Sequence, residues 1–358
     1  MIKVLIVDDS PFIQKVLRQM LSFDPEIEVI GEASNGREAI TKIIELKPDV
    51  VCLDIMMPQP DGLATIERIN RLCPTPIIVF SAISAMSSEI TAEALRLGVI
   101  DVVQKPQQHE SIRVIRGELL NKLKSAARVD TVKLKEFYSS LNTARKIEDR
   151  VPQAVISTRV VAIGSSAGGP PALYKLVSSF PSDLNAGVLV GQHLPPHFVA
   201  GMAAHMKKFV PFPVKVADDG DIVALGRILI SPADTTMCVS KIKHGGVVHL
   251  SNIECEMKTR PCINGMFKSV AECYGRNAIG IVLSGMGNDG TEGLRAIKAA
   301  GGITFAQDEA TSLVYGMPQA AAKAGVVDYI MSVEEIAKEV SALLNMRKIE
   351  SMGKDNNE

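Results

Sequence analysis

Hydrophobic and polar positions alternate in blocks along the first third of the chain. Short apolar runs, which predict strands, fall at 2–7, 27–33, 49–53, 76–80 and 99–103. Amphipathic segments with helical spacing follow them, at 12–23, 36–46, 62–72, 87–97 and 110–126. Repeated strand–helix units predict a parallel sheet with helices on both faces, so we expect an α/β, doubly wound (βα)5 domain over residues 1–127.

A second strand–helix series begins at Arg159. Its predicted strands are 159–163, 186–191, 278–283, 303–306 and 326–329. Its predicted helices lie near 170–179, 197–208, 263–275, 290–300, 317–324 and 333–345. Between 214 and 251, short alternating stretches with glycine turns predict an antiparallel excursion on a mainly parallel sheet. Residues 158–350 are therefore predicted to form a second α/β domain, followed by a polar tail at 351–358.

The segment 128–157 breaks the pattern and predicts an interdomain linker, helical in part around 132–147. It is rich in Lys, Arg, Ser and Thr, with Pro152 near its end. A solvated face explains these basic residues better than nucleic-acid binding does. The whole chain has a formal net charge of −1 and a pI near 6.6, so nothing indicates bulk attraction to nucleic acid or anionic lipid.

Composition narrows the class further. Hydrophobic residues make up 46% and aromatic residues 4%, with no Trp, which predicts aliphatic cores. The six cysteines are scattered without CxxC spacing and are expected to be reduced thiols. No apolar run reaches the roughly 18 residues of a membrane span, and the chain starts with a strand pattern instead of a signal peptide. We therefore expect a cytoplasmic protein with no membrane insertion.

Three aspartates follow two of the predicted strands in the first domain. Asp8 and Asp9 follow the run 2–7, and Asp54 follows the run 49–53. The carboxyl ends of parallel strands meet at one edge, where doubly wound sheets bind ligands. Three carboxylates there repel one another, and a hard divalent cation such as Mg²⁺ would offset them.

Two further strand ends complete a phosphoryl-transfer constellation. Ser81 offers a hydroxyl and Lys105 a positive charge. In this arrangement Asp54 would attack the phosphorus, while Ser81 and Lys105 would bind the transferred oxygens.

The first domain resembles the receiver domains of two-component systems. The strings that carry this resemblance are Val7-Asp-Asp-Ser-Pro, Leu53-Asp-Ile-Met-Met-Pro, Ser81-Ala and Lys105-Pro. The resemblance implies that a partner histidine kinase phosphorylates Asp54. It also implies that Asp8, Asp9 and Asp54 bind Mg²⁺.

The second domain starts with a glycine-rich turn, Ile163-Gly-Ser-Ser-Ala-Gly-Gly-Pro-Pro, between a strand and a helix. Small residues at a sharp turn of this kind expose a serine, here Ser166, as a nucleophile beside a helix N-terminus. A turn of the same composition also suits a phosphate cradle, and the string alone does not separate the two readings.

Residues after two other strands favour a nucleophile. His193 follows the strand 186–191, and Asp289 lies in the string Ser284-Gly-Met-Gly-Asn-Asp after the strand 278–283. Ser166 would attack, His193 would act as general base and then acid, and Asp289 would orient the imidazole. The backbone N–H of Met286 is a candidate oxyanion donor. Asp289 alone would be read as an N-cap of the helix 290–300.

The second domain resembles the catalytic domain of chemotaxis protein-glutamate methylesterases. The matching strings are Ile163-Gly-Ser-Ser-Ala-Gly-Gly, Gln192-His-Leu-Pro-Pro-His-Phe, Leu283-Ser-Gly-Met-Gly-Asn-Asp-Gly and Ala306-Gln-Asp-Glu-Ala-Thr-Ser-Leu-Val-Tyr-Gly-Met-Pro. By position, the family's catalytic residues fall on Ser166, His193 and Asp289. Cys262, Asn264 and Thr236 depart from the family pattern. The triad residues themselves are unchanged, and the departures leave the substrate-facing surface and the catalytic efficiency open.

This resemblance implies a phosphorylation-regulated esterase with methylated chemoreceptors as substrate. It would hydrolyse glutamate methyl esters, and deamidate glutamines, without a cofactor at the esterase site. The receiver would occlude this site until Asp54 is phosphorylated. Two alternatives stay open: a non-catalytic regulator that binds a receptor or kinase, and a hydrolase of small esters or nucleotide binder at the turn Gly164–Gly169.

Overall fold

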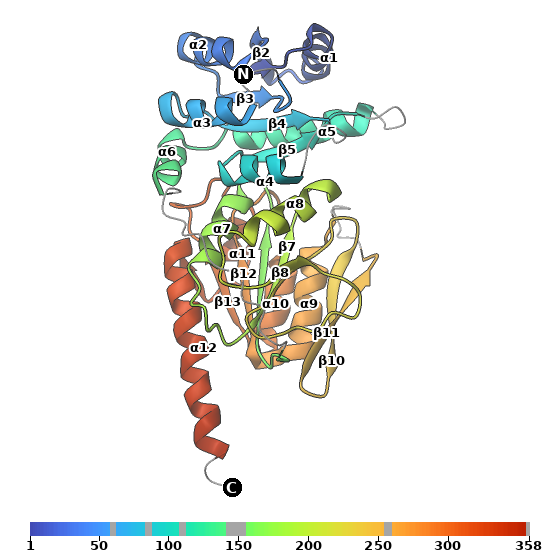
Figure 1. Ribbon diagram of the computed structural model, residues 1–358, viewed down its shortest axis with the longest axis vertical. Coiled ribbons are helices and arrows are strands. Elements are labelled where there is room, and N and C mark those ends of the chain that lie inside the picture. The colour runs from blue at the N-terminus through green and yellow to red at the C-terminus, as the bar shows by residue number, and fades with distance from the viewer. Residues whose placement is uncertain (58–61, 83–87, 107–111, 141–154, 254–259, 356–358) are drawn as a thin grey trace. The chain divides into compact units, whose positions relative to one another are not determined.

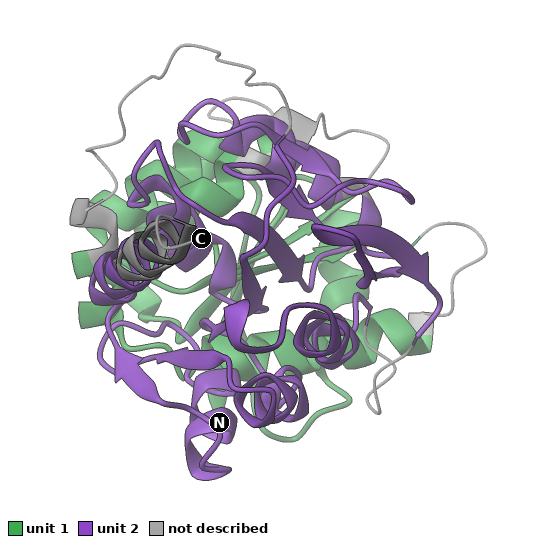
Figure 2. Cartoon of the chain, turned by 90° about the horizontal axis from the view of Figure 1, so that it is seen from below, with its two compact units in different colours: residues 1–143 green, residues 144–358 purple. Residues whose placement is uncertain are grey.

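The computed structural model describes residues 1–57, 62–82, 88–106, 112–140, 155–253 and 260–355. The chain divides into two compact units, residues 1–143 and 144–358 (Figure 2). No helix among the described residues is both long and apolar enough to cross a bilayer.

Unit 1 contains a five-stranded sheet whose neighbouring strands run parallel. Its strands are β1 (Ile2–Val7), β2 (Ile27–Ala33), β3 (Val50–Leu53), β4 (Ile77–Ser81) and β5 (Asp101–Gln104). They lie in the order β2-β1-β3-β4-β5, which confirms the predicted doubly wound fold. The order reverses between β1 and β3, so the residues after these two strands meet at the switch point where such sheets bind ligands.

The helices of unit 1 follow the predicted pattern. They are α1 (Pro11–Leu21), α2 (Gly36–Leu46), α3 (Gly62–Leu72), α4 (Ser88–Arg96), α5 (Ile112–Ala126) and α6 (Thr131–Ser140). Side chains at two helix starts satisfy the unpaired N–H groups, since Ser10 accepts from Ile13 and Asn35 accepts from Glu38. Helix α6 lies in the predicted linker yet belongs to unit 1, with Leu134 fully buried. The rest of the linker up to residue 154 lies outside the described residues.

Unit 2 contains a seven-stranded parallel sheet (Figure 1). Its strands are β6 (Val160–Ser165), β7 (Gly187–Gln192), β8 (Val214–Val216), β9 (Ile228–Ile230), β12 (Ala278–Val282), β13 (Ile303–Gln307) and β14 (Tyr329–Met331). The order is β14-β13-β12-β6-β7-β9-β8. Every residue of β6, β7 and β12 is buried, as expected for strands covered on both faces. The order reverses between β6 and β12, which makes the ends of these strands the switch point of this sheet.

The antiparallel part of unit 2 is smaller than predicted. Strands β10 (Thr236–Ile242) and β11 (Gly245–Ser251) form a separate two-stranded hairpin, whereas β8 and β9 pair in parallel within the main sheet. The prediction of an excursion over 214–251 was therefore wrong for the first half of that segment. Short strands with glycine turns look alike in sequence whichever partner they pair with.

The helices of unit 2 are α7 (Gly169–Ser178), α8 (Pro196–Met206), α9 (Ile263–Tyr274), α10 (Thr291–Ala299), α11 (Met317–Lys323) and α12 (Val333–Asp355). Residues of α9, α10, α11 and the hairpin form one hydrophobic core cluster with the central strands. Helices α7 and α12 pack against each other. The last helix continues through Asp355, into the segment predicted as a polar tail.

Candidate functional site

The turn after β6 presents Ser166 at the switch point of unit 2. Gly168 adopts a φ of +65°, a left-handed conformation that favours glycine. A Cβ at this position would also lie 2.8 Å from the Ser284 hydroxyl, so both the backbone and the space require glycine. The Gly169 N–H closes the turn by donating to the Ser166 carbonyl at 2.8 Å. This is the sharp strand–helix turn that the glycine-rich string predicted.

Gln192, at the end of β7, ties this turn to the neighbouring strand. Its buried amide accepts a hydrogen bond from the Ser165 hydroxyl and donates to the Ser166 carbonyl at 3.0 Å. It also donates to the His193 carbonyl at 3.2 Å. One side chain therefore links the backbone at Ser166 with the backbone at His193, a contact that sequence reasoning missed.

His193 is held by two acceptors on the same ring nitrogen. Its Nε2 lies 3.0 Å from Asp289 Oδ2 and 3.1 Å from the carbonyl oxygen of Pro261. A carbonyl oxygen accepts hydrogen bonds and never donates them, so Nε2 carries a proton. In the neutral imidazole Nδ1 is then the unprotonated nitrogen, available as a base.

Asp289 is buried, and backbone N–H groups satisfy its carboxylate. Oδ2 accepts from Ile263 at 2.9 Å, and Oδ1 accepts from Asn264 at 2.8 Å and from Gly290 at 2.9 Å. Asp289 thus satisfies donors at the start of α9, while Gly290, the N-cap of α10, supplies no side-chain bond there. The N-termini of two helices meet at this carboxylate, and their dipoles favour its negative charge.

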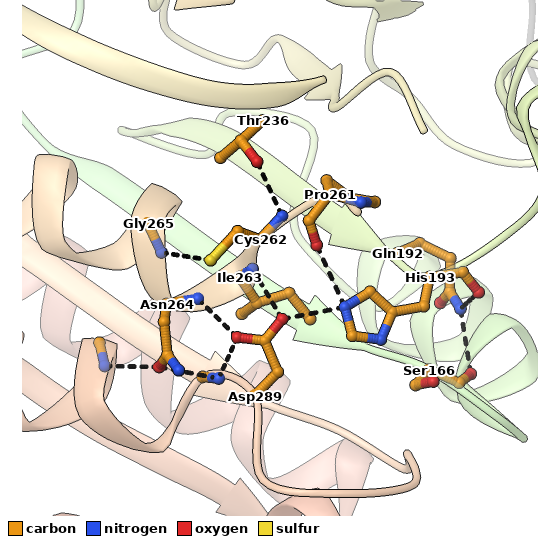
Figure 3. A network of polar contacts seen from close by, with 12 residues as sticks. Ser166, Gln192, His193, Thr236, Pro261, Cys262, Ile263, Asn264, Gly265 and Asp289 are labelled. Carbon is orange, nitrogen blue, oxygen red and sulfur yellow. Dashed lines mark hydrogen bonds and ion pairs between the residues drawn. The ribbon is translucent and has the colours of Figure 1, made fainter. Parts of the chain in front are cut away.

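The structure brings the three predicted residues to one edge of the sheet. In Figure 3 the His193 ring lies between Asp289 on one side and Ser166 on the other. Among the described residues the Ser166 hydroxyl makes no hydrogen bond with His193 or any other group. His193 and Asp289 are therefore hydrogen-bonded, whereas the described residues show no hydrogen bond between Ser166 and His193. Such contacts often tighten only when substrate binds.

The turn Gly285–Gly287 packs directly against the serine. A Cβ at Gly285 would lie 3.0 Å from the backbone nitrogen of Ser166. The Gly285 N–H donates to Val314 and the Ser166 N–H donates to Ser284, so neither points at a free oxyanion position. Met286 is the next residue of this turn, and 36% of its surface is exposed.

The three departures from the family pattern lie in the network around Asp289. The Asn264 N–H binds Asp289 directly, and the Cys262 sulfur accepts from Gly265 in the first turn of α9. The Cys262 N–H donates to the buried Thr236 hydroxyl at 2.8 Å. Periodicity could not reveal this, because the contacts run through backbone groups at the start of a helix.

The prediction of reduced cysteines was wrong for Cys262. This residue is disulfide-bonded. The free cysteines among the described residues are Cys52, Cys73, Cys238 and Cys273.

In unit 1, the acid pocket gathers at the switch point between β1 and β3. Oxygen atoms of Asp8, Asp9 and Asp54 lie within 4.8 Å of one another. Asp8 and Asp54 are buried, while Asp9 is exposed. This donor set of carboxylate oxygens fits a hard divalent cation.

The two other predicted residues contact the pocket. The Ser81 hydroxyl donates to Asp54 Oδ1 at 2.6 Å, and the Lys105 ammonium binds Asp54 and, at 2.7 Å, Asp8. Burial raises the pKa of Asp8, and the neighbouring Asp54 charge adds to this against the opposing effect of Lys105. Burial alone would lower the pKa of Lys105, but its bonds to the two carboxylates raise it overall.

Comparisons with known proteins match both units. A profile of the family described as CheB methylesterase matches residues 161–340, and one described as response regulator receiver domain matches residues 4–115. The chain belongs to the CheB methylesterase family. A relative from Pyrococcus horikoshii, named protein-glutamate methylesterase/protein-glutamine glutaminase, is 39% identical over 95% of this chain and 92% of its own length.

Other members of the family agree with this assignment. A Sulfurimonas denitrificans protein of the same name is 39% identical and covers 97% of this chain and 99% of its own length. A solved structure, the catalytic domain of Thermotoga maritima CheB methylesterase, is 31% identical. It covers 52% of this chain and all of that domain, with a TM-score of 0.51. The family resemblance drawn from the sequence is confirmed over nearly the whole chain.

Proposed function

We propose that this protein is a phosphorylation-regulated serine esterase that hydrolyses glutamate γ-methyl esters on chemoreceptors. The observation that carries the proposal is the His193–Asp289 pair beside the Ser166 turn, in a chain of the methylesterase family. The names of the relatives support deamidation of glutamine as a second reaction of the same site. We place the reaction in the cytoplasm, where the signalling segments of chemoreceptors lie.

The chemistry is acyl transfer in two steps. His193 Nδ1 takes the Ser166 proton as Oγ attacks the ester carbonyl carbon, and methanol leaves with that proton. Water then attacks the acyl-enzyme, and His193 again serves as the base, which releases a glutamate carboxylate. We assign the Met286 backbone N–H to the oxyanion. With glutamine as substrate, ammonia would leave in place of methanol.

Asp289 orients the imidazole and stabilises its charged form. The Pro261 carbonyl accepts a second hydrogen bond from Nε2. In triads where the aspartate alone selects the tautomer, changing it to asparagine costs about 10⁴-fold in kcat. Here the Pro261 carbonyl also accepts from Nε2 and would keep the proton there, so we expect Asp289→Asn to cost clearly less than that loss in kcat. Ester hydrolysis rates measure this, with Asp308→Asn in the same unit as a matched control. A loss near 10⁴-fold would contradict the role given to Pro261.

In unit 1 we assign Asp54 as the phosphoryl acceptor and a histidine kinase as the donor. The support is the buried carboxylate, with Ser81 and Lys105 on its two oxygens. Asp8, Asp9 and Asp54 would hold Mg²⁺, which supplies charge neutralisation during phosphoryl transfer when bound. Lys105 orients the acceptor carboxylate, and Ser81 is placed to bind a phosphoryl oxygen.

Phosphorylation would control access to the esterase site. A phosphoryl group adds a charge of about −1.5 to −2 at the acid pocket, where Ser81 and Lys105 can rearrange around it. We propose that the unphosphorylated receiver occludes the Ser166 turn and that phosphorylation releases it. Such control requires only that the phosphoryl group stabilises the released arrangement more than the occluded one.

The test is methanol release from a chemoreceptor fragment that carries glutamate methyl esters. The full-length protein should release methanol, and release should rise with Mg²⁺ and a small-molecule phosphodonor. Ammonia release from the unmethylated glutamine form tests the second reaction. Binding of the fragment without release of either product would favour the alternative, a non-catalytic response regulator.

A further inference from the structure

The starts of helices α9 and α10 are joined by side chains that each helix lends to the other. Asp289, just before α10, accepts from Ile263 and Asn264 at the start of α9. In return the Asn264 amide oxygen accepts from Gly290 at 3.0 Å and from Gly293 at 2.8 Å, in the first turn of α10. The two helices therefore satisfy each other's unpaired N–H groups.

The Asn264 amide accepts a hydrogen bond from α10 that Asp289 does not accept. Helix α10 has no side-chain cap of its own, because its N-cap is Gly290. The Gly290 N–H is shared between Asp289 Oδ1 and Asn264 Oδ1, and among the described residues only Asn264 accepts from Gly293. Without this amide, Asp289 would be the one side chain among the described residues that forms hydrogen bonds with both helix starts.

Helices α9 and α10 are closely packed, so a substitution can change their contact mainly at the hydrogen bonds of Asn264. A Cβ at Gly293 would lie 2.4 Å from the Cβ of Phe267, so the two helices approach closely. The other side of Asn264 borders a cavity of about 480 Å³ that Asp289 also lines. A change of the side chain at Asn264 therefore alters the hydrogen bonds without overfilling a packed core.

We propose that Asn264 is a positioning residue that fixes the Asp289 carboxylate against His193. The inference rests on the proposed esterase function. The direction of the carboxylate depends on how α10 sits against α9, and Asn264 holds that arrangement from α9. The Pro261 carbonyl lies in the same segment as Asn264. This short segment therefore positions both acceptors of the His193 Nε2 proton, Asp289 and Pro261.

The kinetic test compares Asn264→Ala with Asn264→Asp. The alanine variant loses the acceptor, and we expect kcat to fall about 10-fold or more with KM unchanged, because small misplacements of catalytic groups cost up to about 10²-fold. The aspartate variant keeps an oxygen acceptor. Its added charge lies at two helix N-termini, which favour it, so its kcat should be much nearer to wild type. Equal losses in both variants would overturn the proposal.

Thr304→Val is the matched control. Thr304 is the second residue of β13 and is fully buried. Its hydroxyl lies 2.8 Å from the Val326 carbonyl and 2.9 Å from the Asp328 carboxylate, and it accepts from the Asp328 N–H at 3.0 Å. The variant therefore loses buried hydrogen bonds in the same unit, away from the strand ends of the site. It should lower Tm as Asn264→Ala does and leave kcat at the wild-type level. If kcat fell equally in this control, lost stability alone would explain the effect of Asn264→Ala, and the positioning role would be contradicted.

A second readout needs no substrate. The His193 Nε2 proton, shared between Asp289 and Pro261, should give a low-field proton NMR signal in the full-length protein, which His193→Gln identifies by removing it. Asn264→Ala should weaken or shift this signal, and Thr304→Val should keep it. An unchanged signal in Asn264→Ala overturns the positioning role even if the wild type hydrolyses ester. A lost signal with no ester hydrolysis by the wild type would instead count against the proposed function alone.

Discussion

Ser166→Ala should abolish methanol release from methylated receptor, with kcat lower by about 10⁶-fold, the loss seen when serine hydrolases lose their nucleophile. The hydroxyl belongs to the turn between β6 and α7, at the sheet edge where His193 and Asp289 also lie. No other group in the proposed mechanism forms the acyl-enzyme. The substitution removes a hydroxyl that makes no hydrogen bond within the described residues, so Tm should stay close to the wild-type value.

Ser165→Ala is the matched control for this prediction. Ser165 is the neighbouring serine in the same turn, but its hydroxyl is fully buried and donates to Gln192. Its loss removes one buried hydrogen bond, worth about 1 kcal/mol, and should lower Tm more than kcat. If Ser166→Ala released methanol at the wild-type rate, the esterase assignment would fail. If Ser165→Ala were the inactive variant, the nucleophile would be the other serine.

The strand pattern was enough to predict both sheets and the positions after their strands. Asp8 and Asp54 could be expected to meet, because they follow β1 and β3, which are neighbours in a doubly wound sheet. The same reasoning brought Ser166, His193 and Asp289 to one edge of the second sheet. The hydrophobic period and the strand order predict which edge of a sheet a residue occupies. The chemistry of its side chain then suggests a function.

The contacts that hold these residues could not be predicted in the same way. Asp289 looked like a cap for α10, but its carboxylate binds N–H groups of α9, which start 26 residues earlier in the chain at Ile263. The family string from Ala306 to Pro318, which starts at the end of β13, carried no chemistry in the sequence. In the structure Gln307 accepts from Ser284, and Val314 accepts from Gly285, so the string braces the turn beside Ser166. Backbone donors have no sequence signature, so such partners emerge only from the fold.

Asp54→Asn should eliminate phosphoryl labelling of the protein by a small-molecule phosphodonor. The asparagine side chain would lack the carboxylate that attacks phosphorus, while keeping an oxygen that can accept from Ser81 and from the Met56 N–H, as Asp54 does now. The fold of unit 1 should therefore survive, which far-UV circular dichroism can check. Label is measured as a hydroxylamine-sensitive acyl phosphate.

Asp49→Asn is the matched control for the acceptor. Asp49 precedes β3 as Asp54 follows it, and its exposed carboxylate only accepts from the Lys3 N–H at 2.7 Å. This variant should be labelled like the wild type. Label on Asp8 or Asp9 in the Asp54→Asn protein would overturn the choice of acceptor, because either carboxylate would then have attacked from the cation site.

The Asp54→Asn variant also separates two proposals: that Asp54 is the phosphoryl acceptor, and that phosphorylation controls the esterase site. In the wild type the phosphodonor should raise methanol release, and in Asp54→Asn this rise should vanish along with the label. A rise that persists without label at Asp54 would mean that the donor acts somewhere other than the acid pocket. A label on wild-type Asp54 with no rise would keep the acceptor and refute control of the esterase site. Coupling between the units is thus tested apart from the chemistry of each.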